Sequence, residues 1–199
     1  PLSSIKDMAL WLSDVVESAN VKTASFIGHS MGSQIALEFA ANNHKKVKAL
    51  ALLGSALSIP VNPILLESAD NDTNLAFNLL NSWGYGRRAQ IGCHQVPGLW
   101  MMRGGLRVLE QSARKVLHTD LLATNDYSGE KAAPAVKCPT LILMGERDIM
   151  TPARSGKELG KMIPGSTQTV LPDVGHIMLE EDPDGTLDAL RDFILPLWS

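Results

Sequence analysis

The chain has 199 residues, of which 45% are hydrophobic and 20% charged, and this composition excludes a disordered, collagen-like or disulfide-rich chain. Eighteen basic and twenty-one acidic residues give a net charge of −3, so we expect no nucleic-acid partner. There is no apolar run of ~18 residues, no signal pattern and no metal-type spacing of Cys93 and Cys138. We therefore expect a cytoplasmic protein without a membrane span, metal or cofactor.

The first part of the chain alternates helical and strand patterns. Apolar residues at helical spacing, from Ile5 to Val16, predict a helix with Ser4 and Asp7 as its capping pair. Apolar runs at 24–27 and 47–53 predict two buried strands, with a helix between them that ends near residue 42. The nearly continuous apolar character of the second run is typical of a parallel sheet.

The alternation stops between about residues 57 and 130. No strand pattern is present there, whereas helical patterns occur at 74–80 and 106–122, separated by a loop rich in glycine that includes Gly104 and Gly105. The last part resumes the alternation, with strands predicted at 140–144 and 167–171 and helices at 152–162 and about 187–194. The sequence thus predicts an α/β core of residues 1–56 and 131–199, in which helices cover both faces of a mostly parallel sheet, and a helical cap inserted at 57–130.

The predicted cap is locally basic. Residues 84–118 contain six basic residues and one acidic residue, Glu110, for a net charge of +5. One interpretation is a solvated helical face, and the other is a lid that attracts an acidic substrate or carrier. The basic residues are Arg87, Arg88, Arg103, Arg107, Arg114 and Lys115.

One motif carries a strong chemical signal. The segment 28–32, GHSMG, matches G-x-S-x-G between a predicted strand and a predicted helix. A sharp strand-to-helix turn exposes the Ser30 hydroxyl, and Gly28 and Gly32 permit the close chain approach that the turn needs. The helix N-terminus favours developing negative charge, and the N–H of Met31 is placed to bind an oxyanion. The motif predicts that Ser30 is a nucleophile.

A serine nucleophile needs a base, and the base needs an acid to orient it. His176 follows the last predicted strand, at the sheet edge where ligands gather in parallel folds, and is our candidate base. Asp148 follows the preceding strand and is our first candidate acid, ahead of Glu146 and Asp173. We expect His29, next to the nucleophile in the chain, to point away from the Ser30 hydroxyl. Capping, packing or surface positions explain the remaining histidines, which are His44, His94 and His118.

Three segments together resemble the α/β-hydrolase superfamily, in its small lidded esterase-like branch: GHSMGS at 28–33, CPTLILMGERDIMTPA at 138–153 and LPDVGHIMLEEDP at 171–183. The resemblance implies a triad of Ser30, Asp148 and His176, with Met31 as an oxyanion donor and a cap where this chain has its insertion. Serine rather than aspartate at the elbow favours hydrolysis of a small or medium apolar ester, thioester, lactone or carbon–carbon bond. The alternative function is ligand binding, with weak or no catalysis, on the same fold.

The insertion also supplies candidate pocket residues. Large aromatic and flexible methionine side chains suit an apolar substrate, although packing of the cap on the core also explains them. The candidates are Trp83, Trp100, Met101 and Met102.

The superfamily resemblance implies further strands before the elbow strand, and a second oxyanion donor in a loop among them. Residues 1–23 instead predict one helix, so we expect the strand at 24–27 to form an exposed sheet edge. We expect a missing N-terminal segment, a second chain or a homodimer partner to cover this edge.

Overall fold

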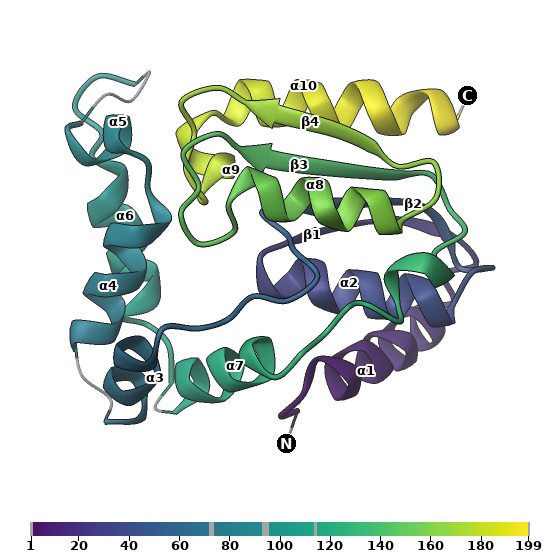
Figure 1. Cartoon of the computed structure of the whole chain (residues 1–199), viewed down its shortest axis with the longest axis horizontal. Helices are drawn as coiled ribbons and strands as arrows, with labels where there is room; N and C mark the ends of the chain where they lie inside the picture. Colours follow the sequence, from purple (N-terminus) through teal and green to yellow (C-terminus); the bar gives the residue numbers. More distant parts are fainter. Residues whose placement is uncertain (1, 72–73, 93–95, 114, 199) are drawn as a thin grey trace.

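The structure is a computed structural model that describes residues 2–71, 74–92, 96–113 and 115–198 (Figure 1). Four strands form one parallel sheet in the order β1-β2-β3-β4, so their carboxyl ends lie at the same edge. The predicted α/β class and all four predicted strands are confirmed. The strands are β1 (Ala24–His29), β2 (Val47–Leu53), β3 (Thr140–Gly145) and β4 (Thr167–Leu171).

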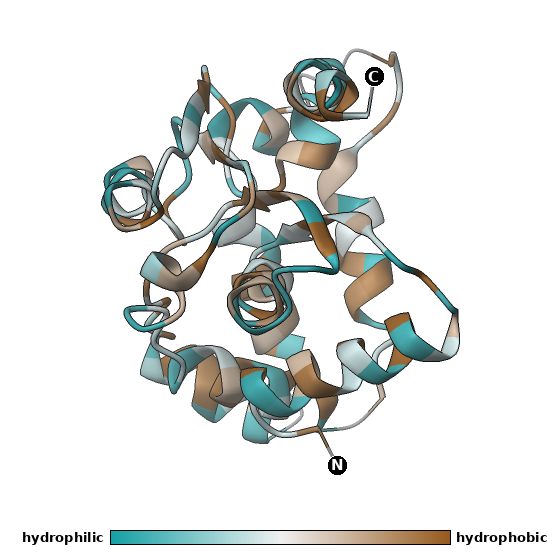
Figure 2. Ribbon diagram, turned by 90° about the vertical axis from the view of Figure 1, so that its right-hand side faces the viewer, coloured by the Kyte–Doolittle hydropathy of each residue, from teal (hydrophilic) through white to brown (hydrophobic). Residues whose placement is uncertain are grey.

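Helices cover both faces of the sheet, because successive strand side chains point to opposite sides and both sides are apolar. Leu50 and Ile142 pack toward α2 and α8, whereas Leu53 and Leu143 pack toward α9 and α10. In the view of Figure 2, helices surround the strands on both sides. The core helices are α1 (Ile5–Ser18), α2 (Met31–Asn42), α8 (Ala153–Met162), α9 (Met178–Glu181) and α10 (Pro183–Ile194). Of these, α9 is absent from the sequence prediction because it has only four residues.

Helix α1 begins as predicted, with the Ser4 hydroxyl accepting a hydrogen bond from the Asp7 N–H at 3.1 Å. Its apolar face is only partly buried. Ile5 and Val16 are enclosed, whereas Trp11 is 54% exposed. Strand β1 also differs from the buried strand that its composition predicts. It pairs only with β2 among the described residues, and Ile27 is 52% exposed, as the predicted sheet edge requires. What covers this edge stays a prediction.

The insertion lies beside the carboxyl ends of the strands (Figure 1). It contains α3 (Pro63–Asp70), α4 (Asn74–Gly84), α5 (Arg87–Gln90), α6 (Met101–Leu109) and α7 (Val116–Asn125). Among the residues described, no helix has the length and apolarity that crossing a bilayer requires.

Two predictions for the insertion are wrong. The single helix predicted over 106–122 is two helices, because the chain leaves α6 after Leu109 and Lys115 adopts a left-handed conformation with φ of 65° before α7. Gly104 and Gly105 lie within α6 rather than in a loop. A Cβ at position 105 would lie 2.5 Å from the Tyr85 hydroxyl, so glycine at this position lets α6 approach its neighbours closely.

Candidate active site

Ser30 occupies a strained turn between β1 and α2. Its φ of 55° and ψ of −123° are unusual for a residue with a side chain. Backbone bonds hold this turn, since the Ser30 N–H donates to the Leu53 carbonyl at 2.9 Å. A Cβ at Gly28 would lie 2.3 Å from the Gly32 carbonyl oxygen, whereas a Cβ at Gly32 would meet open space. The turn therefore requires glycine at position 28, and the expectation of the same requirement at Gly32 is wrong.

His176 and Asp148 form a buried pair at the carboxyl edge of the sheet. His176, in the loop after β4, places Nδ1 2.7 Å from Oδ2 of Asp148, in the loop after β3. The two residues are only 2% and 4% exposed. The two alternative acids lie elsewhere: Glu146 accepts a hydrogen bond from the backbone N–H of Asp173, and both are exposed.

The surroundings of Asp148 favour its ionised form. Burial by itself would raise the pKa of this carboxyl, but the hydrogen bond and charge of His176 and hydrogen bonds from Thr151 outweigh burial and hold the pKa below its usual range. Oδ1 accepts the backbone N–H groups of Met150 and Thr151, each at 2.8 Å. The carboxylate is thus fixed as an acceptor for Nδ1–H of His176.

Sequence reasoning missed Thr151 and Gly54, which position this pair. The Thr151 hydroxyl donates to Oδ2 of Asp148 at 2.6 Å and lies 3.2 Å from Nδ1 of His176. Gly54 packs against the imidazole, because a Cβ there would lie 2.9 Å from Cε1 of His176. Thr151 lies three residues after Asp148 in the same loop, and this spacing is the sequence signal that could have predicted a hydrogen bond between their side chains.

Ser30 and His176 line the same cavity, of about 260 Å³. Nε2 of His176, the ring nitrogen opposite the Asp148 contact, is buried and has no hydrogen-bond partner among the described residues. We call this space the histidine cavity, since His29 and His176 both line it. Its position leaves Nε2 as the nitrogen that can exchange a proton with groups in the cavity.

The sequence predicts that His29 points away from the site, and this prediction is wrong. Its Nε2–H donates to the His176 carbonyl oxygen at 2.7 Å, and the two rings lie 4.8 Å apart. Burial, followed by the charge of His176, lowers the pKa of His29 to about 4. His29 is therefore neutral at ordinary pH and keeps a second positive charge away from His176.

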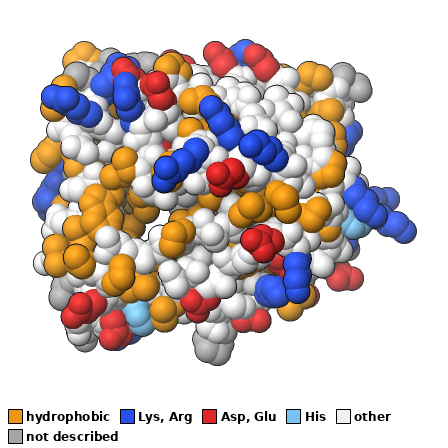
Figure 3. Space-filling view, viewed as in Figure 1, with side chains coloured by type: hydrophobic (Ala, Val, Ile, Leu, Met, Phe, Trp, Pro, Cys, Tyr) orange, Lys and Arg blue, Asp and Glu red, His pale blue; other side chains and the backbone are white. Residues whose placement is uncertain are grey.

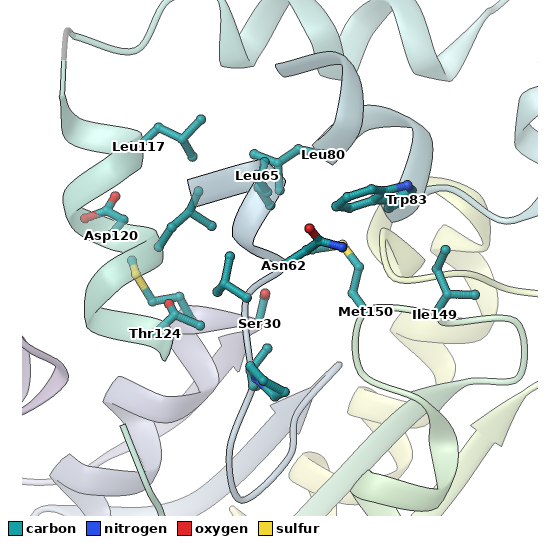
Figure 4. A pocket seen from close by; sticks show the side chains of 15 residues that line it. Ser30, Asn62, Leu65, Leu80, Trp83, Leu117, Asp120, Thr124, Ile149 and Met150 are labelled. Atoms are coloured by element: carbon teal, nitrogen blue, oxygen red, sulfur yellow. The ribbon is translucent and has the colours of Figure 1, made fainter. Parts of the chain in front are cut away.

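A second cavity, of about 370 Å³, also opens at Ser30. We call it the tryptophan cavity. Figure 4 shows Ser30 between Trp83, Ile149 and Met150 on one side and the α7 residues Leu117 and Thr124 on the other. Met31 lines it too, and as the first residue of α2 its N–H has no partner within the helix. In Figure 3 hydrophobic side chains border a hollow where the insertion meets the core.

The four predicted pocket residues occupy different places in the structure. Trp83 lines the tryptophan cavity, but the other three candidates line neither cavity. Trp100 is 56% exposed, and Met101 is buried against Tyr85, with Met102 packed on the same cluster. Apolar residues that sequence reasoning missed line the tryptophan cavity instead: Leu65, Leu80, Leu117, Leu121 and Met150.

None of the described basic residues of the insertion lines either cavity at Ser30. Arg87 and Arg88 line a separate hollow with Arg147, and the Lys and Arg side chains over α5 lie away from the hydrophobic hollow (Figure 3). The charged residues that line the two cavities are acidic, Asp120 and Glu180. This geometry favours the solvated-face interpretation over a lid that attracts acidic substrates. Three residues of the sequence argument lie outside the described residues: Cys93, His94 and Arg114.

Within the described ranges, no three His, Cys, Asp or Glu side chains are grouped so that they could hold a metal ion.

The comparisons with known proteins agree on the family. The model of the alpha/beta hydrolase fold family matches residues 3–183, and the chain belongs to this family. The relative named "Putative carbamate hydrolase RutD" from Klebsiella pneumoniae is 27% identical over 200 residues, which cover 95% of this chain and 72% of that protein.

Solved structures show the same fold. An esterase from Exiguobacterium antarcticum superimposes with a TM-score of 0.86 at 18% identity, covering 100% of this chain and 75% of the esterase. The enol-lactonase from Burkholderia xenovorans has a TM-score of 0.85 at 20% identity, and the match covers 96% of this chain and 73% of the lactonase.

Proposed function

We propose that this chain is a serine hydrolase that cleaves small or medium apolar carboxylic esters through Ser30, His176 and Asp148. The observation that carries the proposal is the buried contact of 2.7 Å between His176 and Asp148, beside a cavity that Ser30 also lines. Membership of a hydrolase family, and relatives named as carbamate hydrolase and esterase, support hydrolysis at a carbonyl carbon.

The proposed mechanism gives each of these groups one role. Ser30 Oγ attacks the substrate carbonyl while Nε2 of His176 takes the hydroxyl proton. Asp148 holds Nδ1–H and stabilises the imidazolium, and the N–H of Met31 binds the developing oxyanion. His176 then returns the proton to the leaving oxygen, and a water molecule, activated by the same ring, hydrolyses the acyl-enzyme.

A panel of acyl substrates tests this proposal. It contains 4-nitrophenyl esters of increasing acyl length, a thioester, a lactone and a carbamate. We expect ester turnover that Ser30→Ala removes, by about 10⁵-fold or more in kcat, and that Ser112→Ala, at an exposed serine, leaves intact. Full activity of Ser30→Ala would refute the nucleophile assignment.

The competing function is ligand binding on the same fold. A fluorophosphonate probe and intact-protein mass spectrometry separate the two functions. Stoichiometric labelling of Ser30 together with turnover of the panel supports the hydrolase. Labelling without turnover of any panel member supports the binding protein.

A further inference from the structure

We propose that the histidine cavity receives the leaving group of the substrate, and that Asn81 selects leaving groups that carry an additional O–H or N–H donor. This inference rests on the proposed function and names the substrate class of the same site. The preferred substrate is therefore an ester with an apolar acyl part and a hydroxylated or amine-bearing alcohol part.

The position of His176 indicates which cavity holds the leaving group and which holds the acyl chain. In the proposed mechanism the leaving oxygen must receive its proton from Nε2 of His176. His176 lines the histidine cavity and not the tryptophan cavity. The leaving group therefore lies in the histidine cavity. The acyl chain lies in the tryptophan cavity, which is walled mainly by apolar side chains and also contains Met31, the proposed oxyanion donor.

Asn81, on α4, provides an unsatisfied acceptor in the histidine cavity. The residue is only 8% exposed, and its Oδ1 is buried without a hydrogen-bond partner among the described residues. A buried polar atom without a partner is costly, and most such atoms in folded proteins are paired. A donor on the bound leaving group would satisfy Oδ1 of Asn81.

Tyr85 and Glu180, on the same wall as Asn81, also leave acceptors in place. The Tyr85 hydroxyl lies 2.5 Å from Oε2 of Glu180 and 3.4 Å from the Met101 carbonyl oxygen, and the short contact with Glu180 takes its only proton. Burial and the Glu180 carboxylate raise the pKa of Tyr85, so the hydroxyl keeps that proton. Asn81 Oδ1 and the Glu180 carboxylate thus present acceptors to the cavity, which favours a ligand that donates.

Gly105 lies directly beside this acceptor. A Cβ at position 105 would lie 2.5 Å from the Tyr85 hydroxyl and 3.1 Å from Oδ1 of Asn81, inside the cavity wall. Gly104, its neighbour in α6, has nothing within 4 Å of a built Cβ. The two glycines therefore form a matched pair, since alanine at either position changes helix propensity equally but only one fills the cavity.

Two nearly isosteric esters test the proposal: 2-hydroxyethyl hexanoate and propyl hexanoate, which differ in a terminal O–H. We expect kcat/KM to favour the hydroxyethyl ester about tenfold in the wild-type protein. Asn81→Leu should bring the ratio close to one, whereas Asn81→Asp, which keeps an acceptor, should retain the preference. Gly105→Ala should also reduce the ratio, and Gly104→Ala should leave it unchanged, with folding checked by thermal melting.

A binding measurement separates this inference from the proposed function. In Ser30→Ala, calorimetry should give an about tenfold lower Kd for the hydroxyethyl ester, and Asn81→Leu in that background should abolish the difference. Equal rates and equal Kd values for the two esters would overturn the inference, even if both are hydrolysed. Absence of hydrolysis with the Kd difference intact would refute the proposed function and keep the selectivity of Asn81.

Discussion

The core loops and the helical insertion contribute different kinds of groups to the space around Ser30. The core loops supply polar groups that bond to one another within a few ångströms, such as Asp148, Thr151 and His176. The insertion supplies mostly apolar walls, with Asn81 as an isolated acceptor. From this difference we expect the proposed reaction to depend on the core and the choice of substrate to depend on the insertion.

The sharpest test of the core half of this comparison is Asp148→Asn. The amide cannot accept Nδ1–H as a carboxylate does, so kcat should fall by about 10⁴-fold while the fold persists. Asp173→Asn is the matched control, because this exposed aspartate pairs with Arg147 rather than with His176. Steady-state kinetics on one 4-nitrophenyl ester would decide, and equal losses in both variants would show that the buried pair has no special role.

The expected role of the insertion in substrate choice is tested by Trp83→Ala, with Trp100→Ala as its control. Trp83 lines the tryptophan cavity and Trp100 does not. Loss of Trp83 should lower kcat/KM for a hexanoyl ester about tenfold or more, with a much smaller effect on an acetyl ester. Trp100→Ala should change neither rate. A uniform loss for both acyl lengths would mean that Trp83 acts on the chemistry rather than on substrate choice.

Thr151 is a positioning residue by its contacts, and Thr151→Val should lower kcat about tenfold with little change in KM. The variant removes the hydroxyl that holds Oδ2 of Asp148. Thr151→Ser restores a hydroxyl and should recover most of the rate. Failure of the serine variant to recover activity would indicate that the methyl packing of Thr151 matters instead.

The smallest expected effect concerns stability near His29. The pKa of His29 is about 4 in the folded protein and near 6.5 when unfolded, so the unfolded state binds the extra proton between these values. Neutral His29 therefore contributes to the free energy of unfolding above pH 6.5, and this contribution is lost as the pH falls toward 4. Tm should therefore decrease over this range, and the decrease should be shallower in His29→Gln. Parallel Tm curves for both proteins would contradict the assignment.

The sequence predicted the core well because its signals are local. A run such as 47–53 is apolar at every position except Lys48 because both sheet faces are covered, and GHSMG specifies its own turn. The insertion lacks such signals. Helix periodicity shows that Met101 has an apolar environment but not whether that environment is a cavity or the Tyr85 cluster. The sequence predicts a loop at Gly105 because glycine is common in loops. The structure instead requires glycine there because of a close contact with Tyr85, twenty residues away in the chain.

The exposed edge of β1 lies close to the proposed nucleophile along the chain. Ser30 directly follows His29, the last residue of β1, and Ile27 lies exposed only three residues earlier. A strand that added to the free side of β1 would hydrogen-bond to the backbone that sets the direction of the Ser30 hydroxyl. We therefore expect that a segment or chain covering this edge would affect the direction of the Ser30 hydroxyl without entering either cavity.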